Sequence, residues 1–163
     1  MAAGGLVGDD IVNAMVANRI AQPDCAHGFL LDGYPRTIPQ ARFLAELADE
    51  RGLPEPVVIY MEVPADLLVA RLTARRQCPE CRRIYNLLSQ PPRVPGICDD
   101  DRAPLQTRDD DQECVIRRRL AAYQEVTGPV LAWYGPQAVY KVDGSLSPEQ
   151  VAQAIEQALT ACV

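Results

Sequence analysis

The chain has 163 residues, of which 48% are hydrophobic and 23% are charged, a composition typical of soluble globular proteins. This length allows one domain with a sizeable core, or one core plus a small insertion. The net charge of −6 argues against general binding to nucleic acids or anionic membranes. We expect no membrane span, because no run of 18 apolar residues occurs, and the first ten residues do not resemble a signal peptide. These features favour a cytoplasmic protein.

Helices and short apolar strands alternate along the first half of the chain. The patterns predict a helix over 8–22, a buried strand over 29–31, a helix over 38–51, a second buried strand over 56–63 and a helix over 64–76. The first of these helices would carry its apolar residues on one face, at Ile11, Met15, Val16 and Ile20.

The alternation is interrupted and then resumes. Residues 77–107 lose helical periodicity and are rich in Cys, Pro, Gly and Asp. A long helix over 109–134, kinked or broken at Gly128-Pro129, a strand over 138–144 and a helix over 147–159 follow. Strands that alternate with helices indicate an α/β fold with a parallel sheet, so we interpret the interruption as an inserted subdomain.

Four potential metal ligands lie in this insertion as two pairs. Cys78 and Cys81 are separated by two residues, and Cys98 and Asp101 follow after a loop of sixteen residues with the same two-residue spacing. Zinc prefers four tetrahedral ligands, and a site filled by four protein ligands is structural rather than catalytic. Asp99 and Asp100 are alternatives to Asp101, and cysteines with no metal are the other alternative.

The segment "LLDGYPRT", Leu30 to Thr37, follows the predicted strand over 29–31. Ligands of α/β folds bind where strands end, so Asp32 could reach Mg²⁺ through water and Arg36 could grip a phosphate. The alternative is a simple Asp-Gly turn beside a solvated arginine.

Arginine supplies all but one of the sixteen basic residues, and four arginines flank the insertion in sequence. They are Arg71, Arg75, Arg108 and Arg119. Arg71 and Arg75 would share a helical face. Phosphoryl transfer needs positive charge around the developing phosphate charge. The alternative is that these arginines form salt bridges with their acidic neighbours, Asp109–Asp111 and Glu113.

Taken together, these motifs resemble adenylate kinases of the bacterial type with a zinc-binding LID. "GFLLDGYPRTIPQA" resembles the family signature, "RLTARRQCPECRRIYN" with "PPRVPGICDDD" resembles the LID, "TRDDDQECVIRRRL" resembles the segment leaving it, and "AGGLVGDDIV" resembles the end of the AMP-binding region. The similarity runs from about residue 2 to the C-terminus. It implies a P-loop nucleoside monophosphate kinase-like parallel sheet with helices on both faces. Its parts would be a partial CORE with a remnant of the AMP-binding region (1–75), the LID (76–108) and the C-terminal part of the CORE (109–163).

The resemblance also implies a reaction and its residues: reversible phosphoryl transfer from Mg-ATP to AMP, giving two ADP, in a protein that is a monomer at full length and carries one structural zinc. The catalytic residues implied are Asp32, Arg36, Arg75, Arg108 and Arg119. AMP would contact Leu6, Val7, Gly33, Tyr34, Pro35, Arg36, Gln40, Arg108 and Arg119. ATP would contact Arg71, Arg75, Ile84, Tyr85 and Gly144, and zinc would be bound by Cys78, Cys81, Cys98 and Asp101.

One family motif is missing from these 163 residues. The P-loop has the form G-x-x-x-x-G-K-[ST], but the only lysine is Lys141, preceded by Tyr140 and followed by Val142. The missing first strand would lie between the two predicted strands at 29–31 and 56–63. We therefore expect an N-terminally truncated adenylate kinase with little or no activity. The alternatives are a non-catalytic zinc- and nucleotide-binding remnant, a related nucleoside monophosphate kinase, and a zinc-ribbon nucleic-acid binder, which the net charge disfavours.

Overall fold

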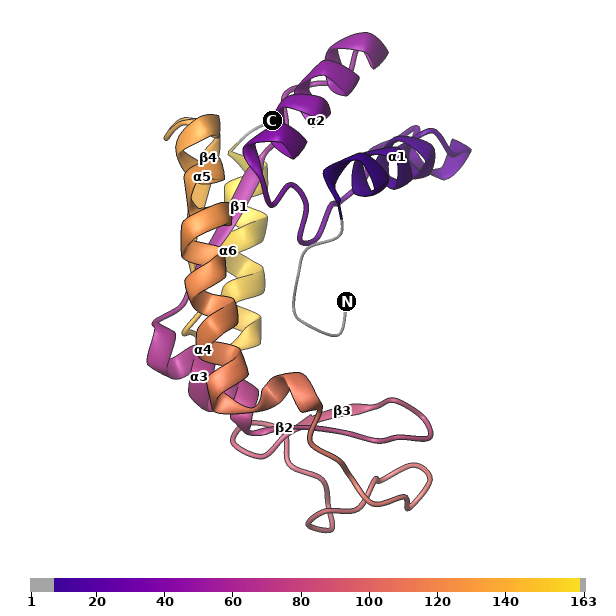
Figure 1. Ribbon diagram of the computed structural model, residues 1–163, viewed down its shortest axis with the longest axis vertical. Helices are drawn as coiled ribbons and strands as arrows, with labels where there is room; N and C mark the ends of the chain where they lie inside the picture. The colour runs from indigo at the N-terminus through magenta and orange to yellow at the C-terminus, as the bar shows by residue number, and fades with distance from the viewer. Residues whose placement is uncertain (1–7, 162–163) are drawn as a thin grey trace. The chain divides into compact units, whose positions relative to one another are not determined.

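The computed structural model describes residues 8–161 (Figure 1). The helices are α1 (Asp9–Ile20), α2 (Ile38–Arg51), α3 (Ala65–Thr73), α4 (Glu113–Ala122), α5 (Gly128–Tyr134) and α6 (Pro148–Thr160). The strands are β1 (Val58–Glu62), β2 (Arg75–Gln77), β3 (Ile84–Asn86) and β4 (Val139–Asp143), and 3₁₀ turns occur at Pro23–Cys25 and Asp109–Asp111. The chain divides into two compact units, which we describe separately.

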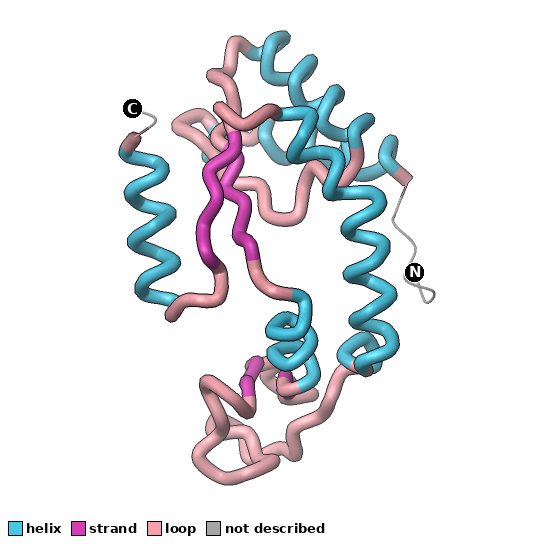
Figure 2. The backbone as a smooth tube through the Cα atoms, turned by 90° about the vertical axis from the view of Figure 1, so that its left-hand side faces the viewer, coloured by secondary structure: helices cyan, strands magenta, loops and turns pink. Residues whose placement is uncertain are grey.

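The first unit comprises residues 1–61, 122–142 and 148–163 and holds most of the β1–β4 sheet. The N–H of Val58 donates to the carbonyl of Ala138 at 3.0 Å, and at the other end of the pair the N–H of Gly144 donates to the carbonyl of Glu62 at 2.9 Å. Like ends of the two strands therefore meet, so β1 and β4 are parallel neighbours (Figure 2). This confirms the predicted α/β fold with parallel strands.

The predicted buried strand over 29–31 is wrong. These residues are not in a strand, and the side chain of Leu30 is 86% exposed. A strand needs a hydrogen-bonding neighbour, and within residues 8–161 β1 pairs with β4 and β2 pairs with β3, which leaves none for this segment. For the same reason β1 is not fully buried as predicted: its first three residues are half-buried and Met61 is exposed.

Helix α2 matches the predicted range because both of its ends carry strong signals. The Thr37 side chain accepts a hydrogen bond from the N–H of Gln40 and caps the start, while Gly52 ends the helix with a left-handed φ of 63°. Its buried face, Ala41, Leu44 and Leu47, forms much of the core of this unit.

Helix α1 behaves differently from its sequence pattern. Of the four apolar residues expected on one face, only Ile20 is buried, whereas Ile11 and Met15 are exposed. No described part of the chain covers Ile11 and Met15 on that face.

The irregularity predicted at Gly128-Pro129 takes the form of a π-helical turn over Tyr123–Thr127. The N–H of Gly128 donates to the carbonyl of Tyr123, five residues back. Proline at position 129 has no N–H to donate and its ring crowds the preceding turn, so the wider turn lets the helix continue into α5.

The second unit comprises residues 62–121 and 143–147. Strands β2 and β3 form an antiparallel hairpin in which Arg76 faces Tyr85, and Gln77 pairs with Gln106 at the other side of the insertion. Cys78, Tyr85 and Cys98 form a small buried cluster, packed against Ala103 and Leu105 (the lid core).

The predicted helix over 64–76 runs three residues too far. Helix α3 ends at Thr73, and Arg75 lies in β2, so Arg71 and Arg75 do not share a helical face. The hairpin explains the early end, because strand pairing with β3 engages the backbone of Arg75–Gln77. Among the described residues, no helix is both long and apolar enough to cross a membrane.

Candidate functional site

The four predicted metal ligands lie together. One ligand atom from each of Cys78, Cys81, Cys98 and Asp101 can be chosen so that all lie within 4.8 Å of one another. The Sγ atoms of Cys81 and Cys98 are 3.6 Å apart, and the Sγ of Cys78 lies 3.1 Å from Oδ2 of Asp101. None of the five described cysteines forms a disulfide.

These spacings suit a tetrahedral zinc ion. Zinc–sulfur bonds of about 2.3 Å place two sulfur ligands about 3.8 Å apart, and a sulfur and an oxygen ligand about 3.6 Å apart. The observed separations of 3.6 and 3.1 Å are slightly shorter, so the four ligands need to move apart by only a few tenths of an ångström to bind the ion.

Both alternative fourth ligands are engaged elsewhere. The Asp99 carboxylate accepts the N–H of Arg93 at 2.9 Å, and that of Asp100 accepts the Arg83 guanidinium at 2.6 Å. Asp101 alone of the three turns toward the cysteines. It also accepts the N–H groups of Cys81 and Ala103, which fix its orientation.

The two ligand pairs use the same local turn. The N–H of Cys78 donates to the carbonyl of Arg83, and the N–H of Arg82 donates back to Cys78. Cys98, Arg102 and Ala103 repeat both bonds in the second pair. In each turn the residue after the second ligand is an arginine with a left-handed φ, 62° at Arg82 and 64° at Arg102.

The pKa values of two thiols in this cluster are shifted in opposite directions. Burial opposes ionisation of Cys98, but hydrogen bonds from the Tyr85 hydroxyl and from backbone N–H groups prevail and lower the pKa of this thiol. The backbone N–H of Arg83 favours the Cys81 thiolate, but desolvation and the other three ligands outweigh it and raise the pKa of that thiol to about 12. A divalent cation would offset this repulsion among the ligands.

Arg75 is bound to a buried carboxylate. Its Nε lies 2.8 Å from Oδ2 of Asp111 and its terminal nitrogen lies 2.5 Å from Oδ1, a bidentate pair. The side chain of Asp111 is fully buried and that of Arg75 is 22% exposed. Because Arg75 follows α3 and Asp111 precedes α4, the pair ties together the two ends of the insertion.

Arg108 and Arg119 meet on one carboxylate. Arg108 donates through two nitrogens to Asp110, at 2.9 and 3.1 Å, and Arg119 donates to Oδ2 of the same residue at 3.1 Å. Partial burial opposes ionisation of Asp110, but the hydrogen bonds and charges of the two arginines lower the pKa of its carboxyl. Of the salt bridges weighed from the sequence, those of Arg75, Arg108 and Arg119 are thus formed, with Asp111 or Asp110. Arg71 and Asp109 form none within residues 8–161, and Glu113 pairs with Arg117 instead.

Arg71 lies beside another predicted contact. Its guanidinium donates to the carbonyls of Gly144 at 2.6 Å and Ser145 at 3.1 Å. Of the two remaining predicted ATP contacts, Ile84 is exposed, whereas the Tyr85 ring is buried in the lid core with its hydroxyl 3.4 Å from the Sγ of Cys98.

In the first unit, the segment from Asp32 to Arg36 forms a turn. Gly33 has a left-handed φ of 72°, which favours glycine, and a Cβ there would lie 2.6 Å from a guanidinium nitrogen of Arg36, so that side chain would have to shift. The Nε of Arg36 donates to the carbonyl of Gly33 at 2.7 Å, and the Tyr34-Pro35 peptide is cis. Asp32 is exposed and makes no hydrogen bond or ion pair with residues 8–161.

Gln40 is held by its surroundings rather than free. Its side-chain oxygen accepts the N–H of Arg36 at 2.7 Å, and its nitrogen donates to Asp9 at 2.7 Å. Asp9 also accepts the Thr37 hydroxyl at 2.9 Å, so it joins α1 to the start of α2. Asp9 is not among the predicted site residues, and its place in the first turn of α1 is the only signal that its sequence position carries.

The comparisons with known proteins agree with these motifs. A family model described as adenylate kinase matches residues 1–139. An adenylate kinase from Thermotoga neapolitana is 43% identical over 152 residues, which cover 93% of this chain and 69% of that protein. An adenylate kinase from Pelobacter propionicus is 44% identical, covering 99% and 74%, and one from Carboxydothermus hydrogenoformans is 45% identical, covering 96% and 73%.

The chain belongs to the adenylate kinase family. It is therefore a member of a family of nucleoside monophosphate kinases, and it spans about 70% of the length of these relatives. The predicted nucleotide-binding residues of this chain fall into two sets, one in each compact unit. Leu6 and Val7 lie outside the described residues.

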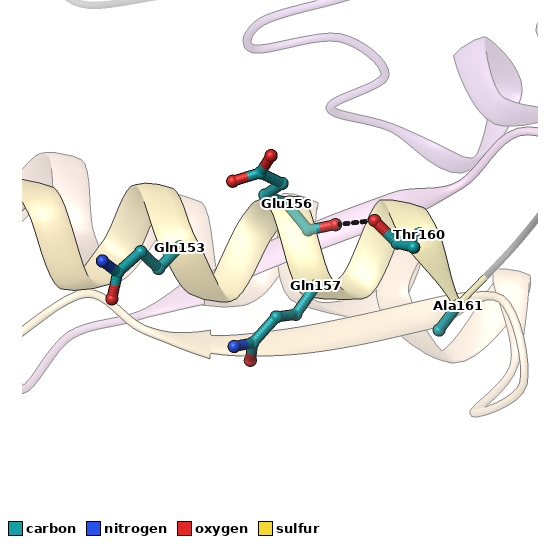
Figure 3. A pocket seen from close by; sticks show the side chains of 5 residues that line it. All are labelled: Gln153, Glu156, Gln157, Thr160 and Ala161. Carbon is teal, nitrogen blue, oxygen red and sulfur yellow. Dashed lines mark hydrogen bonds between the residues drawn. The ribbon is translucent and has the colours of Figure 1, made fainter.

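A surface hollow on α6 does not coincide with either set. It is lined by Gln153, Glu156, Gln157, Thr160 and Ala161 (Figure 3). Four of the five side chains come from α6 and Ala161 directly follows it, and the Thr160 hydroxyl donates to the carbonyl of Glu156 at 2.8 Å. We assign no role to this hollow in the adenylate kinase reaction.

Proposed function

We propose that these residues serve the adenylate kinase reaction, the reversible transfer of a phosphoryl group from Mg-ATP to AMP to give two ADP. The observation that carries the proposal is the meeting of Arg108 and Arg119 on one point. Two guanidinium groups aimed at a single pair of oxygen atoms suit a phosphoryl group, whose transfer depends on positioning and positive charge.

This proposal assigns the predicted residues to the two nucleotides. AMP would contact Gly33–Arg36, Gln40, Arg108 and Arg119, with Leu6 and Val7 near its base. ATP would contact Arg71, Arg75 and Gly144, with Ile84 and Tyr85 in the LID, and Asp32 would position Mg²⁺ through water. The divisions at 1–75, 76–108 and 109–163 would then be partial CORE, LID and C-terminal CORE.

The cysteine cluster would hold a structural zinc ion and fold the LID. Cys78, Cys81, Cys98 and Asp101 supply four ligands and leave no position for a reacting water, so the ion would stabilise rather than react. A Cys98→Ser variant should lose zinc and lower the thermal midpoint, whereas Cys114→Ser, at an exposed cysteine outside the cluster, should change neither. Unchanged zinc stoichiometry in Cys98→Ser would contradict the assignment.

We propose further that the 163 residues alone turn over little or no substrate. The sequence contains no P-loop, so it lacks the backbone cradle and lysine that hold nucleotide phosphates in this family. The missing lysine also favours a second candidate, a zinc- and nucleotide-binding remnant without catalysis.

A coupled assay of ADP formation tests these alternatives. We expect no turnover by the chain alone, and turnover after fusion to the P-loop segment of a relative. In that fusion, Arg119→Gln should reduce kcat/KM by about 100-fold or more, as loss of a transition-state donor does. Arg118→Gln is the matched control, because within residues 8–161 the Arg118 guanidinium donates a hydrogen bond only to the carbonyl of Cys114. Normal turnover by the unfused chain would refute the inactivity, and an inactive fusion would favour the remnant.

A further inference from the structure

Three adjacent aspartates follow Arg108, and they have three different environments. Asp111 is fully buried against Arg75. Asp110 is 37% exposed and holds both Arg108 and Arg119. Asp109 is exposed and takes part in no ion pair or side-chain hydrogen bond with residues 8–161. The three carboxylates therefore differ in how easily an incoming anion could replace them as partners of arginine.

The pairs formed by Asp110 are replaceable. The side chains of Arg108 and Arg119 are 41% and 50% exposed, and exposed ion pairs contribute only about 0.2–1 kcal/mol each. A phosphate chain carries several negative charges and presents oxygen atoms that match the guanidinium fork as a carboxylate does. It can therefore take the place of the Asp110 carboxylate, whereas the buried Asp111 has no such competitor.

We propose that Asp110 is an internal stand-in for a phosphoryl group, which keeps Arg108 and Arg119 converged on the phosphate position until a polyphosphate displaces it. The inference rests on the proposed function for the role of these two arginines. Without a carboxylate between them, the two positive groups would repel each other and separate. When Asp110 is present, an anion of low charge gains little binding free energy by displacing its carboxylate. Asp110 therefore makes this position selective for polyphosphates.

The test compares two variants that lose the same charge one residue apart. Inorganic tripolyphosphate is titrated into the zinc-loaded 163-residue chain, at fixed ionic strength, by calorimetry. Asp110→Asn should bind tripolyphosphate about fivefold more tightly than the unmodified chain, since two surface ion pairs no longer compete. Asp109→Asn should change the affinity less than about twofold, because it alters only the general field.

Inorganic phosphate provides a second probe of selectivity. The unmodified chain should bind inorganic phosphate much more weakly than tripolyphosphate. Asp110→Asn should reduce the ratio of the two affinities. Equal tightening by Asp109→Asn and Asp110→Asn would overturn the proposal, because charge alone would then explain the effect. No tightening, or no binding by any of the three chains, would also overturn it.

A measurement on the unmodified chain guards against misfolding of the variant. The side-chain Nε–H signal of Arg108, followed by nitrogen-15 NMR, should shift when tripolyphosphate replaces Asp110, and an unmoved signal would refute the exchange. Because the probe has no base and the assay needs no turnover, these results are independent of the kinase test. If the fusion were inactive but tripolyphosphate still displaced Asp110 as expected, the proposed function would be refuted and the role of Asp110 at the phosphate position would remain supported.

Discussion

The pair between Arg75 and Asp111 should be worth far more to the fold than the surface pairs around it. The perturbation is to remove one partner at a time, by Arg75→Met and by Asp111→Asn. The two partners are unequally buried, with side-chain exposures of 22% for Arg75 and zero for Asp111. The two variants should therefore differ in cost, although they break the same contact.

Arg75→Met leaves the Asp111 carboxylate inside the protein without a cation. Stranding one member of a buried pair costs about 3–5 kcal/mol, so we expect a loss of about 3 kcal/mol or more in the free energy of unfolding. Asp111→Asn leaves a guanidinium that already reaches water, so its main cost is the charge-assisted hydrogen bonding. That cost is about 1.5–3 kcal/mol, and the remaining Asn oxygen keeps it near the lower limit.

Urea unfolding of the zinc-loaded chain, followed by circular dichroism, gives the two values. The double variant Arg75→Met/Asp111→Leu should cost less than Arg75→Met alone, because it removes the stranded charge. Arg117→Met is the matched control: its partner is Glu113, both side chains are more than half exposed, and we expect a loss of at most about 1 kcal/mol. The reasoning fails if Arg75→Met costs no more than Arg117→Met.

Two further predictions concern backbone strain and alkaline pH. Arg82→Gly should raise the free energy of unfolding by about 0.5–1 kcal/mol, because glycine adopts the left-handed φ without strain. Arg82→Ala should not raise it. Thermal melts of the two variants measure the difference, and equal stabilities would contradict the prediction. Burial, and to a smaller extent the charges of Tyr134 and Asp9, raise the pKa of Tyr34 to about 12 in the folded chain. The contribution of Tyr34 to the free energy of unfolding is therefore fully present below its unfolded pKa near 10 and is lost as the pH rises to about 12. Urea midpoints of Tyr34→Phe measured from pH 9 to 12 should therefore decline less steeply than those of the unmodified chain, and parallel declines would refute the assignment.

Local signals in the sequence predicted the elements whose ends carry them. The Thr37 cap and Gly52 gave α2 its observed bounds, and the spacing of the four ligands predicted the cluster at Cys78 and Asp101. The signals lie within a few residues of each end of α2 and within each of the two ligand pairs, so they can be recognised without knowledge of distant neighbours.

The errors came from partners that the local pattern does not contain. The apolar run at Leu30 looks like a buried strand, but a strand forms only where another strand lies beside it. Arg75 fits a helix by periodicity, yet pairing with β3 places it in a strand. The salt bridges of Arg108 and Arg119 were an open alternative, and charge pattern alone could not choose Asp110 as their common partner.

The repeated turn in the lid has a consequence for how its length can vary. Each pair of ligands is assembled within a four-residue stretch, so the only long closure is that of the sixteen-residue loop between Cys81 and Cys98. Closing such a loop costs about 2.5 kcal/mol of chain entropy plus a constant, and doubling its length would add only about 0.6 kcal/mol. Insertions in this loop should therefore be tolerated, whereas a single residue added inside either turn would separate two ligands that no other part of the lid can bring together.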